Sequence, residues 1–202
     1  ASKAAARLLV KVYRESYNLY AIQGLLFNHE GVRRGEEFVT RKITKGVARI
    51  VKAIHNNEHF EPIELGNVKA RRDWSDAEDF VHGIWLMLNQ DKPNEYVLSS
   101  DETHTIAEFV YYSFKAAGIE GAWHGEAESS EFSITTQDAI RYEPVSSVLV
   151  KINKKYYRPA EVDLLLGDST KARNELKWEP KTSFEQLITK MVKNDLKQIR
   201  LL

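Results

Sequence analysis

The sequence predicts an α/β protein, because apolar runs typical of buried strands alternate with longer segments of helical periodicity. The strand-like run LYAIQGLLF at 19–27 is followed by a helical pattern at 38–55, and the strand-like EYVLSS is followed by the helical THTIAEFVYYSFKAAG. The chain has 202 residues and 43% hydrophobic composition, enough for a core and for one or two domains.

The remaining elements have local signals of their own. The opening segment SKAAARLLVKVYRESYN is an amphipathic helical pattern, while the apolar residues at 19–27 are expected to be buried. Ser75 or Asp76 is a candidate N-cap for a helix that runs to Gln90, and Gly118 is the expected end of another helix. Shorter patterns predict strands at PIEL, AWHGE, EFSIT and SVLVKI and helices at 168–177 and 182–200.

Composition excludes several classes of function. The net charge is zero, with 29 acidic and 29 basic residues, so an extended surface for nucleic acid is not expected. The absence of cysteine excludes disulfides and thiol chemistry, and the histidines lack metal-ligand spacing. No apolar run approaches the ~20 residues of a membrane span, and no signal peptide pattern is present. These features predict a soluble, cytoplasmic protein without a membrane or nucleic-acid partner.

The most informative stretch is NHEGVRRGEEFVTRKI at 28–43. It places Arg33 and Arg34 in a loop after a strand, and Arg41 and Lys42 in the first turn of a helix. Guanidinium groups, an ammonium group and the free N–H groups of a helix start together suit an anionic ligand. On composition alone the alternative is a solvated basic loop whose charge is balanced by neighbouring glutamates, and Arg41 is equally consistent with facing solvent.

Four segments in order resemble the GDP-mannose 4,6-dehydratases, a branch of the extended short-chain dehydrogenase/reductase family. They are the stretch at 28–43, LGNVKARRDWSDAEDFV, YYRPAEVDLLLGDSTKARNELKW and the closing EQLITKMVKNDL. The resemblance implies the tail of a Rossmann-like parallel sheet plus a smaller, mostly helical substrate-binding domain. Rossmann-derived segments are then expected at about 1–30 and 75–118, and nucleotide-sugar-binding segments at about 31–74 and 119–202.

The resemblance also implies an activity. Family members oxidise C4 of the hexose of GDP-mannose with bound NADP, eliminate water across C5 and C6, and return the hydride to C6, which gives GDP-4-keto-6-deoxymannose. The expected cofactor is therefore NADP and the expected partner is GDP-mannose, in a homo-oligomer that is a dimer or a tetramer. The glycine-rich cofactor fingerprint of the family is not found, so the chain is interpreted as the carboxyl-terminal part of a longer enzyme.

Three residues match cofactor positions of the family. Lys3 matches the lysine of Tyr-x-x-x-Lys, which bonds the cofactor ribose and lowers the pKa of the tyrosine one helical turn earlier. That tyrosine would precede Ala1, so the chain alone is predicted to be inactive. His29 and Arg34 match cofactor contacts, although a histidine at a strand end is more often a hydrogen-bonded structural residue.

Five residues match substrate positions of the family. Asn28 is expected close to the sugar diphosphate, and Lys42 and Arg72 are expected to contact phosphates. Arg158 is expected at the phosphates and Glu161 at hydroxyls of the ribose or hexose. Simple ion pairs remain open as alternatives, between Arg72 and a neighbouring aspartate and between Arg158 and Glu161. Packing is the expected role of Trp74, Leu176 and Trp178.

Two other functions are compatible with the same features. One is a reductase or epimerase of the same family that acts on another nucleotide sugar. The other is a non-catalytic module that binds a nucleotide sugar. An upstream coding sequence with the glycine-rich fingerprint and the tyrosine would favour an enzyme over the module.

Overall fold

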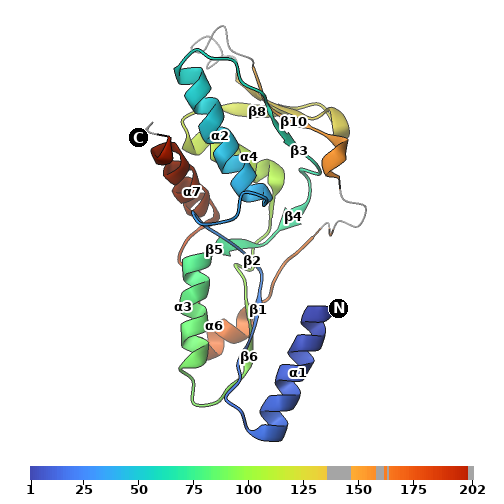
Figure 1. The fold of residues 1–202 in the computed structure, drawn as a ribbon, viewed down its shortest axis with the longest axis vertical. Helices are drawn as coiled ribbons and strands as arrows, with labels where there is room; N and C mark the ends of the chain where they lie inside the picture. The colour runs from blue at the N-terminus through green and yellow to red at the C-terminus, as the bar shows by residue number, and fades with distance from the viewer. Residues whose placement is uncertain (136–146, 158–161, 163, 200–202) are drawn as a thin grey trace. The chain divides into compact units, whose positions relative to one another are not determined.

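The computed structural model describes residues 1–135, 147–157, 162 and 164–199. Contacts divide the chain into two compact units, each built from three segments (Figure 1). Unit 1 comprises Ala1–His29, Asp73–Thr103 and Leu166–Ser183, and unit 2 comprises Glu30–Arg72, His104–Leu165 and Phe184–Leu202. The sequence analysis had instead grouped 104–118 with the first segments and 166–183 with the others. Among the described residues no helix is both long enough and apolar enough to cross a membrane.

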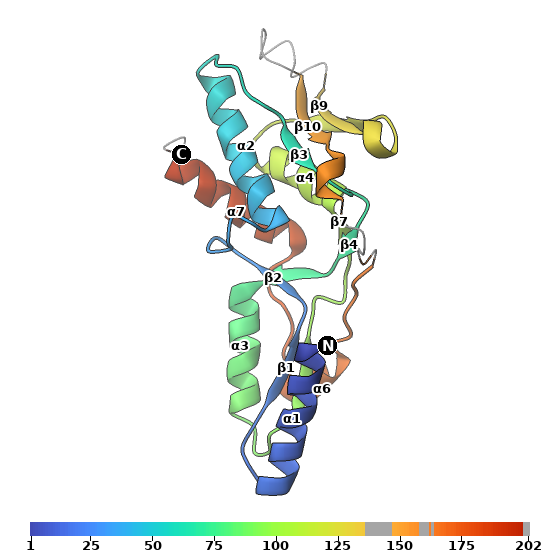
Figure 2. The same cartoon turned by 45° about the vertical axis from the view of Figure 1, so that its right-hand side comes forward.

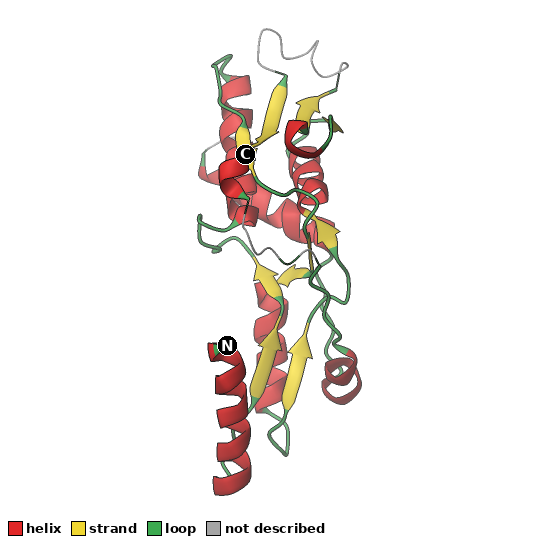
Figure 3. Ribbon diagram, turned by 90° about the vertical axis from the view of Figure 1, so that its right-hand side faces the viewer, coloured by secondary structure: helices red, strands yellow, loops and turns green. Residues whose placement is uncertain are grey.

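Unit 1 is built on a pair of parallel strands that are distant in sequence. Strand β1 (Gln23–Leu26) pairs with β6 (Glu95–Leu98) in parallel (Figure 3). The other elements of this unit are α1 (Ser2–Tyr17), β5 (Trp74–Asp76), α3 (Ala77–Leu88) and α6 (Thr170–Leu176). Strand β2 (Asn28–Glu30), whose first two residues belong to this unit, pairs with β5. Its core cluster consists of Phe80, Met87, Tyr96, Leu98, Ala172, Leu176 and Trp178. The predicted packing roles of Leu176 and Trp178 are thus confirmed.

The apolar run at 19–27 is less buried than the sequence predicts. The strand covers only Gln23–Leu26, and Leu19 and Leu26 are 48% and 37% exposed. A two-stranded sheet has too few neighbours to bury both faces of its strands. Helix α1 forms as predicted, but none of its residues is buried.

Two carboxylates join the second and third segments of unit 1, Asp73–Thr103 and Leu166–Ser183. Asp73 is fully buried and accepts hydrogen bonds from the backbone of Ser100, Asp101 and Gly167 and from the Ser100 hydroxyl, at 2.6–3.2 Å. Asp101 accepts from the hydroxyls of Ser99 and Ser169, from the backbone N–H of Ser169 and from Nε of Arg173. Burial alone would raise the pKa of Asp101, but these donors favour the charged form and the net pKa is lowered.

Asp101 should therefore make the stability of this unit depend on pH. A group whose pKa is lowered by folding stabilises the native state above its unfolded pKa, about 3.9 for Asp, and this contribution disappears as the pH falls through the folded pKa. We expect Asp101→Asn to flatten the fall in the free energy of unfolding between about pH 5 and pH 2 relative to the wild type. Urea unfolding at several pH values tests this, with exposed Asp91→Asn as control. Parallel pH curves for wild type and Asp101→Asn would contradict it.

Unit 2 combines helices with a four-stranded sheet (Figure 2). The sheet has the order β3-β10-β9-β8, with β3 parallel to β10 and the other pairs antiparallel. Its strands are β3 (Ile63–Leu65), β8 (Gly121–His124), β9 (Glu131–Ile134) and β10 (Val148–Ile152), and a separate pair joins β4 (Arg71–Arg72) to β7 (His104–Thr105). The helices are α2 (Val39–His55), α4 (Ile106–Ala116) and α7 (Phe184–Gln198), with short 3₁₀ turns η1 (Ala127–Ser129) and η2 (Lys154–Tyr156).

Capping side chains and a glycine mark the ends of the helices. The Asp76 carboxylate caps α3 by accepting from the backbone of Glu78, as predicted. Thr105 and Glu108 form a reciprocal capping box at the start of α4. Gly118 follows the end of α4 with a φ of +79°, a conformation that favours glycine.

Candidate functional site

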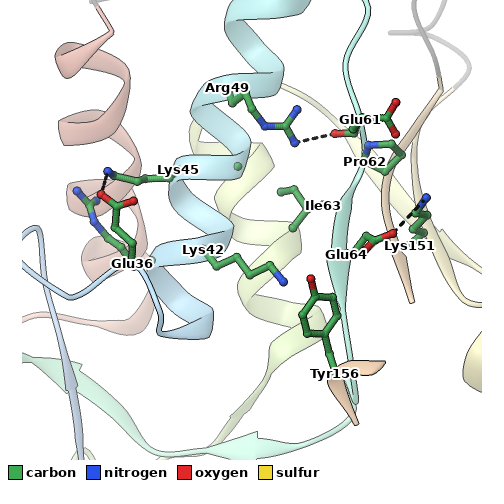
Figure 4. A pocket seen from close by; sticks show the side chains of 12 residues that line it. Glu36, Lys42, Lys45, Arg49, Glu61, Pro62, Ile63, Glu64, Lys151 and Tyr156 are labelled. Atoms are coloured by element: carbon green, nitrogen blue, oxygen red, sulfur yellow. Dashed lines mark hydrogen bonds and ion pairs between the residues drawn. The ribbon is translucent and has the colours of Figure 1, made fainter. Parts of the chain in front are cut away.

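A groove of about 550 Å³ lies in unit 2 beside helix α2 (Figure 4). Its walls come from α2, the strand β3 and the segment that leads into it, β10 and η2. Five cationic side chains and three carboxylates line it, so the groove has an excess of positive charge. The cations are Arg41, Lys42, Lys45, Arg49 and Lys151, and the carboxylates are Glu36, Glu61 and Glu64.

Gly46 helps to open this groove. It lies on α2 where the helix faces β3, and a Cβ atom at this position would lie 2.6 Å from Cδ1 of Ile63. A side chain at position 46 would therefore push Ile63 out of place and narrow the space between helix and strand.

Lys42 is the predicted substrate residue that the structure places in the groove. It lies in the first turn of α2, half-buried, and its Nζ is 3.7 Å from the centre of the Tyr156 ring (Figure 4). A cation over an aromatic face is held by the ring quadrupole while its N–H groups remain able to donate to a ligand. Tyr156 in η2 therefore holds a lysine that can meet an anion.

The other cations of the groove have partners within the protein. Arg41 forms a buried ion pair with Asp195 of α7, and Lys45 pairs with Glu36. The hydrogen bond and charge of Lys45 lower the pKa of Glu36. Arg49 donates to the backbone carbonyl of Glu61 at 2.6 Å.

The suggestion that Arg41 faces solvent is wrong. Its side chain is 5% exposed, because α7 packs against α2 and supplies Asp195 as a counter-ion. Arg41 therefore joins two helices of unit 2, which explains why a basic residue next to Lys42 has a different role.

Arg34 belongs to a second cationic feature of unit 2. Its Nε lies 3.1 Å from a carboxylate oxygen of Glu30, which is 2% exposed, and its guanidinium carbon is 3.5 Å from the centre of the Phe38 ring. The side chain of Arg34 is 24% exposed. The alternative of a fully solvated basic loop therefore does not describe Arg34, although neighbouring Arg33 is exposed.

Arg72 lies on the short strand β4 and is half-buried. Its Nη1 donates to the carbonyls of Arg71 and Val162, at 2.8 and 2.5 Å. The neighbouring aspartate Asp73, suggested as an ion-pair partner of Arg72, points its carboxylate instead at backbone N–H groups of unit 1. Val162 follows Glu161 in the sequence, but Arg158 and Glu161 themselves lie outside the described residues.

The remaining predicted residues belong to unit 1. Lys3 lies exposed in the first turn of α1, as the amphipathic pattern predicts, and Asn28 is half-buried at the start of β2. His29 places Nδ1 2.9 Å from the carbonyl of Phe27 and packs its ring 5.2 Å from the ring of Phe80. A carbonyl only accepts, so Nδ1 is the donor of this hydrogen bond and Nε2 is the ring nitrogen left for another partner.

The sequence analysis missed two residues that hold predicted site residues, Glu30 and Tyr156. Glu30 had a signal, because a carboxylate four positions before Arg34 can pair with it, but the sequence placed it only among the glutamates that balance charge in the alternative of a solvated loop. Tyr156 had none, because its contact with Lys42 joins positions more than a hundred residues apart.

Comparison with known proteins agrees with the resemblance. A family model described as GDP-mannose 4,6 dehydratase matches residues 1–191. The GDP-mannose 4,6 dehydratase of Dictyostelium discoideum is 47% identical over 199 residues, and that of Homo sapiens is 42% identical over 200 residues. These matches cover 98% and 99% of this chain but 52% and 50% of the relatives. The chain thus spans about half the length of the curated relatives it matches.

The fold is similar to that of solved structures. RMD from Pseudomonas aeruginosa complexed with NADPH aligns with a TM-score of 0.71 and 16% identity, over 97% of this chain and 55% of that one. This likeness confirms the expected α/β class with Rossmann-like parallel strands. Because the family model covers residues 1–191 and the relatives align over 98% and 99% of the chain at 47% and 42% identity, the chain belongs to the GDP-mannose 4,6-dehydratase family.

Proposed function

We propose that the full-length protein is an NADP-dependent GDP-mannose 4,6-dehydratase that acts in the cytoplasm as a homo-oligomer. The observation that carries the proposal is the 47% identity to a GDP-mannose 4,6 dehydratase across 98% of the chain. An α/β fold shared with an NADPH-bound structure supports the nicotinamide cofactor. The oligomer and the cytoplasmic location rest on the resemblance and the composition.

The charges that line the groove beside α2 are suited to binding a phosphorylated substrate. A nucleoside diphosphate brings two negatively charged phosphates and a flat base, and the groove offers an excess of cations and an aromatic ring. Within it we assign Lys42 to a phosphate of the substrate. Arg72, Arg158, Glu161 and Asn28 keep their expected substrate roles as part of the proposal.

The cofactor residues are consistent with a dinucleotide. NADP would supply the hydride chemistry, while the residues of this chain bind and orient it. Arg34 offers a guanidinium that is ion-paired with Glu30 on its Nε side, and His29 offers Nε2, because its Nδ1 is engaged by the Phe27 carbonyl. Lys3 is an exposed ammonium group on a helix, suited to the hydroxyls of a ribose.

The activity is tested with the full-length protein. Incubation with GDP-mannose and NADP should give a 4-keto-6-deoxy sugar nucleotide, seen by mass spectrometry as the loss of one water. UDP-glucose and dTDP-glucose should give no such product. Turnover of either control instead of GDP-mannose would indicate a related enzyme for another sugar. Binding of GDP-mannose with no turnover at all would indicate a binding module.

The substrate assignments of Lys42 and Arg72 predict a loss of affinity. A charge-assisted hydrogen bond to phosphate contributes ~1.5–3 kcal/mol, so Lys42→Met and Arg72→Ala should each weaken GDP binding about ten- to hundredfold. Calorimetry of the full-length protein measures this, and exposed Lys52→Met on the same helix as Lys42 is the control. Unchanged GDP affinity in both variants would reject the assignment.

A further inference from the structure

One buried carboxylate links Arg34 to helix α2. Oxygen Oε2 of Glu30 accepts a hydrogen bond from the Thr40 hydroxyl at 2.6 Å, and the same oxygen lies 3.1 Å from Nε of Arg34. Glu30 and Thr40 are 2% and 1% exposed. Phe38 covers one face of the same guanidinium, with 3.5 Å between its ring centre and the guanidinium carbon. Arg34 is therefore held at one edge and on one face.

This arrangement is more than a surface ion pair. An exposed ion pair contributes little free energy, because two mobile side chains must be ordered and because water and salt screen their attraction. Here the Glu30 side chain is already fixed by burial and by Thr40, which lies in the first turn of α2. The rotamer freedom of Arg34 is then reduced before any ligand binds, which is the physical basis of preorganisation.

The contact also determines which N–H groups meet a ligand. The Glu30 carboxylate lies on the Nε side of the guanidinium as an ion-pair partner, without a hydrogen bond to Nε, so a phosphate that approaches Arg34 would be met by its two terminal Nη groups. Two parallel N–H donors match the spacing of phosphate oxygens, and such a bidentate contact depends on orientation.

We propose that Glu30 is a positioning residue, which holds Arg34 so that its Nη groups are directed to a phosphate of the dinucleotide cofactor. The inference rests on the proposed role of Arg34 in cofactor binding. Thr40 fixes the carboxylate and Phe38 fixes the plane of the guanidinium. A carboxylate beside a cation also reduces its attraction for an anion, so two effects of opposite sign compete. For Glu30 to act in this way, orientation must outweigh the Coulomb term, which water and salt screen on the exposed side of Arg34.

A double-mutant cycle in the full-length protein tests this proposal. The affinity for NADPH is measured by calorimetry for wild type, Glu30→Gln, Arg34→Met and the double variant. We expect Arg34→Met to weaken binding about ten- to hundredfold and Glu30→Gln about five- to tenfold. In the Arg34→Met background, Glu30→Gln should change affinity less than about twofold, because the residue it positions is gone. Exposed Glu37→Gln, in the same loop, is the matched control and should bind NADPH like wild type.

Three other outcomes of the affinity measurements would contradict the proposal or the role of Arg34. An equal loss from Glu30→Gln in both backgrounds would show a structural effect and overturn the proposal. Tighter NADPH binding by Glu30→Gln would show that Glu30 competes with the phosphate, and would also overturn it. Unchanged affinity in Arg34→Met would reject the cofactor role of Arg34 itself, a failure distinct from the other two.

A milder variant covers the case in which Glu30→Gln does not fold. Thr40→Val keeps the shape of the side chain and removes the hydroxyl that donates to Glu30. It should weaken NADPH binding about two- to threefold with Arg34 present and should have no effect in the Arg34→Met background. The same loss in both backgrounds would overturn the proposal.

Discussion

Replacing Lys3 by Met in the full-length protein is expected to lower the kcat of the proposed dehydratase reaction by about 10²- to 10⁴-fold, the range of a lost proton-transfer contribution. The reason is electrostatic. An ammonium group one helical turn from a tyrosine stabilises the phenolate, and in the family pattern it also bonds the cofactor ribose. Lys3 occupies the first turn of α1, where its exposed side chain can reach a neighbouring turn.

The pH profile distinguishes this role from a loss of folding. Removal of a positive charge raises the pKa of the nearby tyrosine, so the residual activity should move to higher pH. Lys11→Met is the matched control, since Lys11 lies on the same helix and pairs with Glu15 on its surface. A kcat within about threefold of wild type, or a drop without a shift of the profile, would contradict the catalytic role of Lys3.

Asp73→Asn is expected to have the largest effect on stability, a loss of about 2–4 kcal/mol in the free energy of unfolding. The buried carboxylate accepts four hydrogen bonds from Ser100, Asp101 and Gly167. An amide keeps the shape but has a single acceptor oxygen, and its NH₂ group would face N–H donors that are buried with it.

Thermal unfolding of the 202-residue chain measures this effect. At about 2–4 °C per kcal/mol for a chain of this size, the melting temperature should fall by about 5–15 °C. Asp91→Asn, at an exposed carboxylate, should leave the melting temperature within about 1 °C of the wild-type value. A fall of the same size in both variants would show that Asp73 has no special role.

Local signals in the sequence were sufficient for much of the fold. Helix starts depend on chemistry within a few residues, and so the cap at Asp76 and the end of α4 before Gly118 could be predicted. Trp74 was expected to pack, and it is 3% exposed. Periodicity likewise predicted α2 to within a residue, because its buried positions recur at helical spacing.

Features that depend on distant partners could not be predicted in the same way. Arg41 and Lys42 are adjacent and basic, yet one pairs with Asp195 and the other meets Tyr156. Glu30 and Asp73 look like ordinary surface carboxylates in the sequence, and only the fold shows that both are buried. For the site, the sequence therefore predicted the cations of the loop and of α2 but not the side chains that hold them.

The three-segment construction of unit 1 has a consequence for the order of folding. Strand β1 pairs with β6, about seventy residues later in the chain. Asp73 and Asp101 accept hydrogen bonds from the backbone of Gly167 and Ser169. Closing loops of this length has an entropic cost before any contact compensates for it, so such topologies fold slowly. On the ribosome, β1 stays unpaired until β6 has emerged, and the hydrogen bonds of Asp73 and Asp101 to Gly167 and Ser169 cannot form until residues 166–183 have emerged.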